Sequence, residues 1–423
     1  MIPKTSGRPS LLREPAFRRY WLGRTTSLLG SAMASVAVAF AVLGSGGDGT
    51  ALGAVMAARI LPVVLVLPVG GIVADRLGAR RTALAADALR CAVQAALAAL
   101  LITDRPPVWG TAALVALWGI GEGFSLPALA ALVPALVRDP ARLADANSLL
   151  GLARSTTTVA GPALAGLLVA ATGPAAVLTL DAASYAVGAL ALATVGVPAV
   201  PRGAPDTLLD DLRNGWTEFR SRTWLWLTTV QAGLFNLLVW APFLVLGPLI
   251  AQQRLGGAAA WGTVMAAYGA GAVLGGLLVL GRRPRRPLAV ATVTALGWAL
   301  PSAALAAGAG TAWTALGALG AGVSTAVCDT LFTTATQQHV PAEALGRVHS
   351  FEALGAFVLG PIGLAGAGPL AARLGAGHVL ALGALWQVAA CAAVLAVPAV
   401  RTLRAPTAAE SRPAVRQTVP SPD

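Results

Sequence analysis

The chain has 423 residues, of which 56% are hydrophobic and only 11% are Asp, Glu, Lys or Arg. A soluble protein of this length needs a larger polar surface, so the composition excludes a soluble protein. The formal net charge of +12 is spread over many short loops and is not gathered in one basic patch, which argues against a nucleic-acid partner. Composition and charge therefore predict a protein that crosses a membrane many times.

Apolar segments of about 20 residues, which span a hydrocarbon core about 30 Å thick, recur along nearly the whole chain. Backbone groups have no water partners in lipid, so these segments must be helices. The fold class is an all-α polytopic membrane protein with twelve transmembrane helices. Their expected positions are 20–43, 51–74, 82–101, 108–133, 146–171, 175–198, 224–248, 259–281, 288–308, 311–337, 346–371 and 376–398.

One long polar interruption divides these helices six and six. The predicted domains are an N-terminal six-helix bundle (1–198), a cytoplasmic linker (199–223), a C-terminal six-helix bundle (224–398) and a disordered cytoplasmic tail (399–423) rich in Pro, Ala and Arg.

Basic residues also predict the orientation of the chain. One side offers only Arg105, Arg254 and Arg373, and the other side holds both termini and the remaining arginine-rich loops. The positive-inside rule then places both termini in the cytoplasm. The first nineteen residues lack the short apolar core of a cleavable signal peptide.

The two halves repeat one another. Val133-Pro134 follows the fourth helix as Val340-Pro341 follows the tenth. A motif of small residues and proline, which lets helices pack closely and kink, occurs in the fifth and eleventh helices. Its residues are Gly161, Pro162 and Gly166 in the first copy and Gly360 and Pro361 in the second.

A charged hinge, Gly71-Ile-Val-Ala-Asp75-Arg76-Leu-Gly78-Ala-Arg80-Arg81, joins the second and third helices. It resembles the loop between helices 2 and 3 of major facilitator superfamily transporters, apart from one extra residue, Ala79. The resemblance covers about residues 12–400. It implies a monomer of two pseudo-symmetric six-helix bundles, with a small-molecule substrate bound at the membrane midplane between them.

Three further segments are similar to the bacterial branch of siderophore exporters and macrolide and drug efflux pumps, which implies a multi-pass protein of the bacterial inner membrane. They are Phe17-Arg-Arg-Tyr-Trp21-Leu-Gly-Arg24, Gln338-His-Val-Pro341 and Gly346-Arg347-Val-His-Ser350. Twelve-helix drug–proton antiporters usually carry an Arg in helix 4, but here the segment from Trp118 to Ser125 holds none. A proton relay that depends on that Arg therefore does not transfer.

Two carboxylates lie at equivalent places in the repeat, because Glu122 and Asp329 each precede a repeated proline by twelve residues. This spacing places both about 18 Å along the helix axis from the proline, near the bilayer centre. A charge there costs several kcal/mol, so each is a candidate for proton binding or for holding a cationic cargo. The alternative is a structural role, in hydrogen bonds or in a pair with a buried Arg.

Other candidates complete the proposed pathway and gate. Arg59 is either a counter-ion for a cavity acid or a snorkelling side chain, and Trp118 and Asn236 are expected in the pathway wall. Asp87 and Arg90 are three residues apart on one helix face and are expected to pair with each other or with the hinge. Arg154 and Glu352 are assigned to a cytoplasmic gate, to which Asp87 and Arg90 are added.

The hinge is also expected to belong to this gate. Gly71 and Gly78 allow close approach and a tight turn. By family resemblance, Asp75 meets the positive end of helix 11 and stabilises an outward-open state. Arg76, Arg80 and Arg81 bind acidic groups of the other half or anionic lipid head groups, or only set the topology.

The sequence therefore predicts a secondary active exporter of an amphipathic small organic molecule, driven by proton antiport with alternating access. Import or facilitated passage of a small metabolite is the alternative. A membrane enzyme or a scaffold is a remote one, because His339, His349 and His378 lie near loops on both membrane sides and cannot form one site. We expect no cofactor, no metal site and no catalytic residue, and there is no phosphate-binding loop for ATP.

Overall fold

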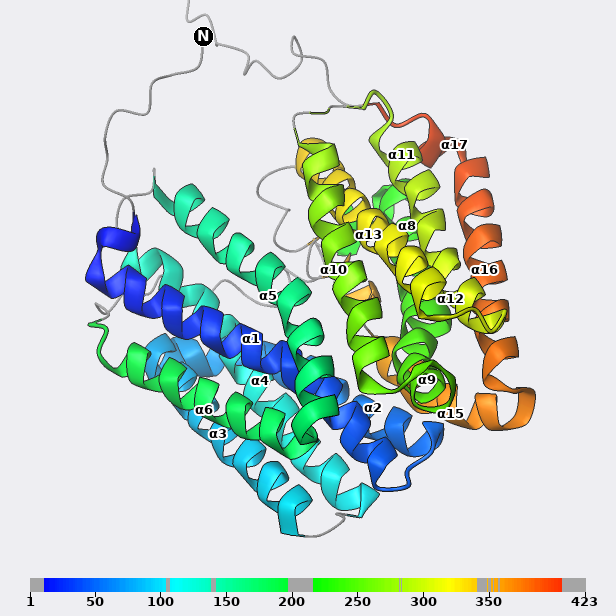
Figure 1. Cartoon of the computed structure of the whole chain (residues 1–423). Coiled ribbons are helices and arrows are strands. Elements are labelled where there is room, and N and C mark those ends of the chain that lie inside the picture. Colours follow the sequence, from blue (N-terminus) through cyan, green and yellow to red (C-terminus); the bar gives the residue numbers. More distant parts are fainter. Residues whose placement is uncertain are drawn as a thin grey trace, which may run out of the picture.

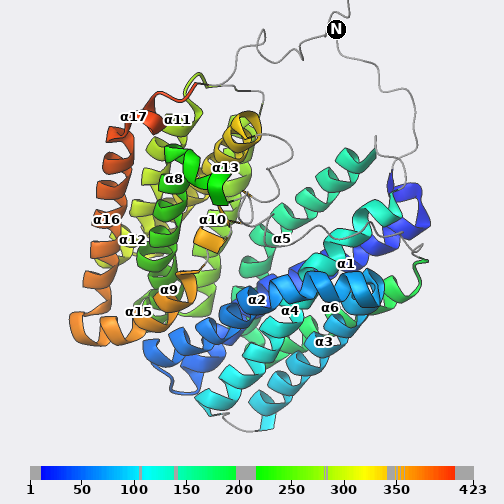
Figure 2. The same ribbon diagram turned by 180° about the vertical axis from the view of Figure 1, so that it is seen from behind.

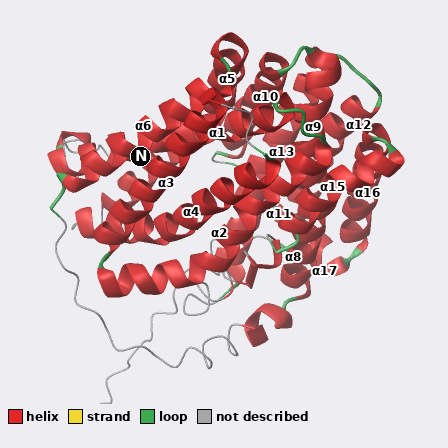
Figure 3. Cartoon of the chain, turned by 90° about the horizontal axis from the view of Figure 1, so that it is seen from below, coloured by secondary structure: helices red, strands yellow, loops and turns green. Residues whose placement is uncertain are grey.

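The computed structural model confirms an all-α membrane protein, and no strand occurs in the part of the chain that it describes (Figure 3). The described residues are 11–103, 107–137, 142–196, 216–280, 282, 284–340, 348, 351–352, 354–356 and 358–404. Within them, twelve helical segments are long and apolar enough to cross a membrane, as predicted.

The N-terminal half begins with a short 3₁₀ turn, η1 (Leu11–Arg13), and then has one helix for each span. The helices are α1 (Pro15–Gly44), α2 (Gly49–Leu77), α3 (Ala79–Thr103), α4 (Val108–Leu136), α5 (Leu143–Thr172) and α6 (Pro174–Ala193).

The C-terminal half contains several interrupted spans. Its seventh span consists of α8 (Thr223–Phe235), η3 (Asn236–Trp240), α9 (Ala241–Ile250) and η4 (Ala251–Leu255), where η3 and η4 are π-helical. The ninth consists of α11 (Pro287–Thr294), a 3₁₀ turn η5 (Ala295–Trp298) and α12 (Ala299–Ala306). The others are α10 (Ala258–Val279), α13 (Thr311–His339), α15 (Gly360–Leu374) and α16 (Ala376–Ala396), followed by α17 (Pro398–Arg401).

The seventh span is longer than predicted. The expected end was residue 248, but the helical path continues to Leu255. It ends at Gly256, whose φ of +95° is a left-handed conformation that glycine adopts without strain. The predicted eleventh helix, 346–371, is described only in part, at 348, 351–352, 354–356 and from 358 onward.

The linker and tail predictions fall mostly outside the described residues. Of the linker, residues 216–221 are helical, and Phe219 lies 6.0 Å from Phe351, measured between ring centroids. The first residues of the predicted tail form α17, in which Val400 is fully buried. The described end of the linker and the described start of the tail are therefore packed on the C-terminal bundle.

The two bundles lie side by side, with the N-terminal half in blue to green and the C-terminal half in green to red (Figures 1 and 2). Helix α2 packs on α4 in the first bundle, and α10 packs on α13 at the equivalent place in the second. Both contacts bring backbones together at glycines. A Cβ atom on Gly271 of α10, for example, would lie 2.0 Å from the carbonyl oxygen of Leu319 in α13.

The halves contact one another mainly through α5 with α10 and α2 with α15. A Cβ on Gly166 would lie 2.9 Å from Cα of Gly262, and a Cβ on Gly368 would lie 2.3 Å from the carbonyl group of Gly49. These contacts lie at the end of the molecule away from α17 and the first turns of α5 (Figures 1 and 2). At the other end, the first turns of α5 and the last turns of α13 lie apart (Figures 1 and 2).

Candidate functional site

An ion pair joins Arg59 of α2 to Glu122 of α4 in the N-terminal half. Nε and Nη2 of Arg59 donate to Oε2 of Glu122 at 3.1 and 3.0 Å, and Nη1 donates to Oγ of Ser35 at 2.8 Å. The two charged side chains are 19% and 26% exposed, so both are largely shielded. Arg59 is therefore the counter-ion of Glu122, which is one of the two roles that the sequence left open.

Close approach of α2 and α4 makes this pair possible. A Cβ on Gly119 would lie 2.2 Å from the backbone oxygen of Arg59, and a Cβ on Gly70 would lie 2.6 Å from the oxygen of Gly123. Atoms cannot approach that closely, so any larger side chain at Gly119 must push the two helices apart.

We expect Gly119→Leu to lower the free energy of unfolding by about 1–3 kcal/mol, because it overpacks the α2–α4 contact. Thermal unfolding of the purified protein in detergent measures the change. Gly151→Leu is the matched control, because a Cβ on Gly151 meets nothing within 4 Å. Equal unfolding temperatures for both variants would contradict the assigned helix contact.

Trp118 connects the ion pair to the interior of the bundle. Its ring is 1% exposed and lies 3.8 Å from the guanidinium carbon of Arg59, a cation–π contact. Its Nε1 donates to the hydroxyl of Tyr185 at 2.8 Å, and that hydroxyl lies 2.8 Å from Oγ of Ser31. Arg59 is thereby held by a carboxylate, a hydroxyl and an aromatic face.

Asp87 and Arg90 form the expected ion pair on α3. Both are almost fully buried, at 4% and 3% exposure, inside the N-terminal bundle. Arg90 also donates to Oγ of Ser125 at 3.1 Å and lies 4.2 Å above the ring of Tyr185. The same Tyr185 thus contacts the Asp87–Arg90 pair and, through Trp118, the Arg59–Glu122 pair.

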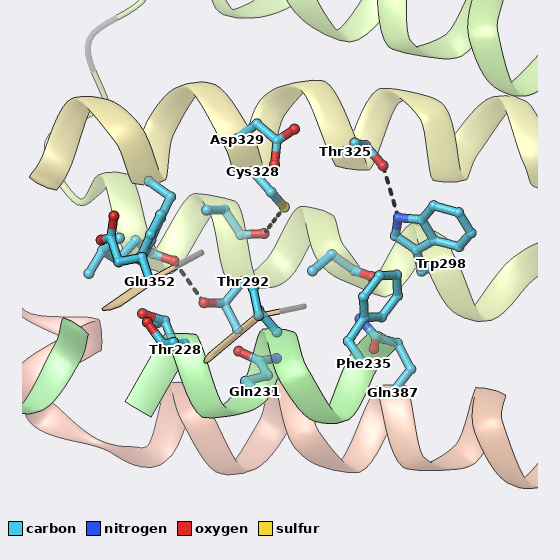
Figure 4. Close-up of a pocket in the computed structure, with 17 residues that line it drawn as sticks. Thr228, Gln231, Phe235, Thr292, Trp298, Thr325, Cys328, Asp329, Glu352 and Gln387 are labelled. Atoms are coloured by element: carbon cyan, nitrogen blue, oxygen red, sulfur yellow. Dashed lines mark hydrogen bonds between the residues drawn. The ribbon is translucent and has the colours of Figure 1, made fainter. Parts of the chain in front are cut away.

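The C-terminal half contains a cavity of about 430 Å³, lined by residues of α8, α11, η5, α13, α16 and the segment before α15 (Figure 4). Asp329 and Glu352 both lie in its wall. Glu352 is 8% exposed and accepts a hydrogen bond from Oγ1 of Thr336 at 3.0 Å. Asp329 is exposed, and Arg154 of α5 acts on it electrostatically from the other half.

Aromatic side chains close one end of the cavity. Trp298 and Phe235 line it with ring centroids 5.2 Å apart, and Trp240 lies 5.0 Å from Trp298, edge to face. Nε1 of Trp298 donates to Oγ1 of Thr325 at 3.0 Å. These contacts fix the rings and give the cavity a rigid apolar wall.

Asn236 lies beside this cavity, at the start of the π-helical turn η3. Its Nδ2 donates to the backbone oxygens of Ala232 and Ala356, each at 3.1 Å. It therefore ties the seventh span to the segment before α15, and its side-chain nitrogen is occupied by these two bonds.

The hinge contains a single non-helical residue. Helix α2 runs through Gly71 and Arg76 to Leu77, and only Gly78, with φ of +94°, makes the predicted tight turn. A Cβ on Gly71 would meet nothing within 4 Å, so the expected close approach is not made there. The side chain of Asp75 lies outside the described residues.

The hinge arginines differ in their contacts. Arg80 donates from Nε to the backbone oxygen of Leu192 at 3.2 Å and also contacts that of Ala193, so it caps the end of α6. Arg76 and Arg81 are exposed. Within the described residues, the contacts of Arg80 are to its own half and not to the other bundle.

The motif of small residues and proline is used differently in its two copies. A Cβ on Gly161 would lie 2.5 Å from Cβ of Ala32 in α1, and Gly166 contacts α10 of the other half. Pro162 lies within helix α5, and its backbone oxygen faces Gly262. In the second copy, Pro361 is buried at the start of α15, but a Cβ on Gly360 would meet nothing within 4 Å.

Two parts of the site were absent from the sequence interpretation. One is the cavity itself, which is assembled from six elements of the C-terminal half. The other is the bridging role of Tyr185, which had no signal beyond being one of three tyrosines in the chain. No group of three or more His, Cys, Asp or Glu suited to a metal ion occurs in the part of the chain that the structure describes.

A fold of twelve membrane helices in two bundles, with charged groups held inside the membrane, defines a polytopic membrane transporter. Residues 20–364 match the family model of the Major Facilitator Superfamily, and the chain belongs to this family. It is therefore a transporter and not an enzyme.

Relatives and solved structures agree with this assignment. Macrolide efflux protein A of Streptococcus pyogenes is 24% identical over 86% of this chain and 91% of its own. An uncharacterized MFS-type transporter of Sinorhizobium fredii is 28% identical over 92% of this chain and 96% of its own. A mutant of the nucleoside transporter NupG has a TM-score of 0.74 at 14% identity, covering 90% and 99%. A mutant of the peptide transporter POT has a TM-score of 0.72 at 13% identity, covering 92% and 95%.

Proposed function

We propose that this transporter exports an amphipathic small organic molecule from a bacterial cell in exchange for protons, by alternating access. The relatives named macrolide efflux protein A support both the direction and the kind of cargo. The observation that carries the proposal is the cavity of about 430 Å³ in the C-terminal half. Its volume suits a drug-sized molecule.

The lining of this cavity supports an amphipathic cargo. Phe235, Trp298 and Phe332 provide apolar surface, and Asp329 and Glu352 provide negative charge at other points of the wall. An apolar body is stabilised by leaving water, and a cationic group on it is stabilised by the carboxylates. Arg154 acts on Asp329 electrostatically from the other half, and a cationic group of the cargo beside Asp329 would take over that role.

Proton coupling is assigned to Glu122. When Glu122 binds a proton, it loses its negative charge, and Arg59 loses its ionic partner. Arg59 then keeps its contacts to Ser35 and Trp118, both in the same half. The N-terminal half thereby senses the proton and the C-terminal half binds the cargo, with Asp329 as a second protonatable group.

The proposed orientation places both termini in the cytoplasm, as the positive-inside rule predicts. The contacts of Gly166 with Gly262 and of Gly368 with Gly49 then seal the extracellular side, so the cavity is loaded from the cytoplasm. In the opposite state, Asp75 and the hinge seal the cytoplasmic side. The exposed Arg76 and Arg81 contact anionic lipid head groups, and the protein works as a monomer.

The test uses purified protein in liposomes that contain a pH-sensitive dye, with an imposed pH gradient and a panel of macrolides and other amphipathic amines. We expect cargo-dependent proton flux in the wild type. In Glu122→Gln, which keeps a hydrogen-bonding partner for Arg59 but cannot release a proton, this flux should fall at least about tenfold, as for the loss of an essential proton-transfer group.

Gln338→Glu is the matched control, because it also changes the net charge by one unit, in the opposite direction, at an exposed residue outside the site. Cargo movement without proton flux in the wild type would overturn antiport and leave the acids as cargo-binding groups. Uptake of small metabolites with no movement of amphipathic amines would favour an importer.

A further inference from the structure

The cavity wall contains one polar atom that is buried and has no partner. Gln387 of α16 is 2% exposed and lines the cavity. Its Nε2 donates to the backbone oxygen of Ala295 at 2.8 Å, but its Oε1 has no hydrogen bond. A buried carbonyl oxygen without a partner costs about 1–3 kcal/mol, so its presence in a cavity wall needs an explanation.

The orientation of this amide is fixed by its neighbours. The backbone oxygen of Ala295 only accepts hydrogen bonds, so the NH₂ group of Gln387 must face it. Nε2 also lies 3.6 Å from Sγ of Cys391. A flipped amide would place two oxygens together, so Oε1 remains the free acceptor.

The surroundings of Gln387 differ from those of the carboxylates. In Figure 4, Gln387 lies beside Phe235 and near Trp298, and Glu352 lies at the opposite end of the view. The cavity therefore offers negative charge at one end and, at the other, an apolar wall with one neutral acceptor. A ligand that satisfies both ends is an amine whose apolar body carries a hydroxyl or N–H donor.

We propose that Gln387 is a specificity-determining residue that selects cargo with a hydrogen-bond donor on its apolar body. This inference rests on the proposed function, because it takes the cavity as the cargo site. Cargo that lacks the donor still enters the cavity, but it leaves Oε1 of Gln387 without a partner. Selectivity is then the difference in binding free energy between a cargo that carries the donor and an otherwise identical cargo that lacks it.

The test compares tamoxifen with 4-hydroxytamoxifen, two tertiary amines that differ by one phenolic hydroxyl at the end away from the amine. Binding to the full-length protein in lipid nanodiscs is measured by competition with the tritiated hydroxylated compound. We expect the wild type to bind 4-hydroxytamoxifen about tenfold more tightly, because only this compound pairs the buried acceptor.

Two variants separate recognition from folding. In Gln387→Met, which keeps the length of the side chain and removes the acceptor, the ratio of the two affinities should fall to about one. In Gln387→Glu, whose buried carboxyl in its protonated form donates to the backbone oxygen of Ala295 and keeps a carbonyl oxygen as acceptor, the preference should return. A ratio of about one in the wild type, or an unchanged ratio in Gln387→Met, would overturn the role of Gln387.

Failure of the inference and failure of the proposed function give different results. If neither amine binds while the wild type still exports other cargo, the cavity is not the site for such amines and the role of Gln387 is overturned alone. If the wild type moves no amphipathic compound in liposomes, the proposed function is overturned as well.

Discussion

Replacing Gly368 with Leu is expected to reduce cargo transport by about 10- to 100-fold without unfolding either bundle. A Cβ at this position would lie 2.3 Å from the backbone of Gly49, so a larger side chain cannot fit while the two halves touch. Overpacking of this kind costs about 1–3 kcal/mol, and here the cost applies only to the state in which this end is closed. The rate of liposome transport measures the effect.

A second measurement shows which state is lost. Thr50 adjoins the contact, because a Cβ on Gly368 would lie 2.3 Å from its backbone nitrogen. In a background without the three native cysteines, Thr50→Cys should react faster with a membrane-impermeant maleimide once Gly368→Leu is added. Gly366→Leu in the same helix is the control, because a Cβ there meets nothing within 4 Å. Equal transport in the two Leu variants would contradict the assigned contact.

The second large effect is expected from removing one partner of the Arg59–Glu122 ion pair. Arg59→Gln leaves the mostly shielded carboxylate of Glu122 without its cation, which should lower the free energy of unfolding by about 3 kcal/mol. The double variant Arg59→Gln with Glu122→Gln removes both charges and should recover most of that loss. Thermal unfolding of the purified variants in detergent measures both values.

Transport separates the structural role of the pair from its functional role. We expect the double variant to fold like the wild type and still show no cargo-dependent proton flux, because neither residue can then exchange a proton. If the double variant pumps protons normally, the pair has only a structural role, and Asp329 becomes the remaining candidate for coupling. If Arg59→Gln is as stable as the wild type, the ion pair does not stabilise the fold.

The contacts of α4 show how a helix can lack a basic residue in its sequence and still be contacted by basic side chains of its neighbours. The fourth helix has no Arg, which made the usual antiporter relay inapplicable. In the structure, Arg59 reaches Glu122 from α2, and Arg90 reaches Ser125 from α3. Two guanidinium groups therefore contact this helix from its neighbours. No pattern within the helix itself could have predicted them, because helix packing determines which side chains meet.

The hinge shows the opposite relation between local sequence and structure. Its turn at Gly78 follows directly from residue type, because the conformation with φ of +94° is favourable only for glycine. The partner of Arg80 did not follow, because the carbonyl groups at the end of α6 come from more than a hundred residues further along the chain. A basic residue in a loop predicts the side of the membrane on which the loop lies. The contacts that the basic side chain makes depend on how the helices of the bundle pack.

The sequence by itself determined the fold class, the twelve spans and the family, because these follow from local properties. Hydrophobic length, the absence of water partners for the backbone in lipid, and the hinge motif are each contained in short stretches of chain. The pairing of Asp87 with Arg90 was also local, since three residues on a helix lie on one face. Only the tertiary structure decided that Arg59 pairs with Glu122, that Tyr185 joins two ion pairs, and that a cavity forms around Asp329 and Gln387. All three features join side chains from helices that are distant in sequence, and the Arg59–Glu122 pair in particular forms where Gly119 and Gly70 let α2 and α4 approach. Which side chains meet therefore depends on the three-dimensional packing of the helices.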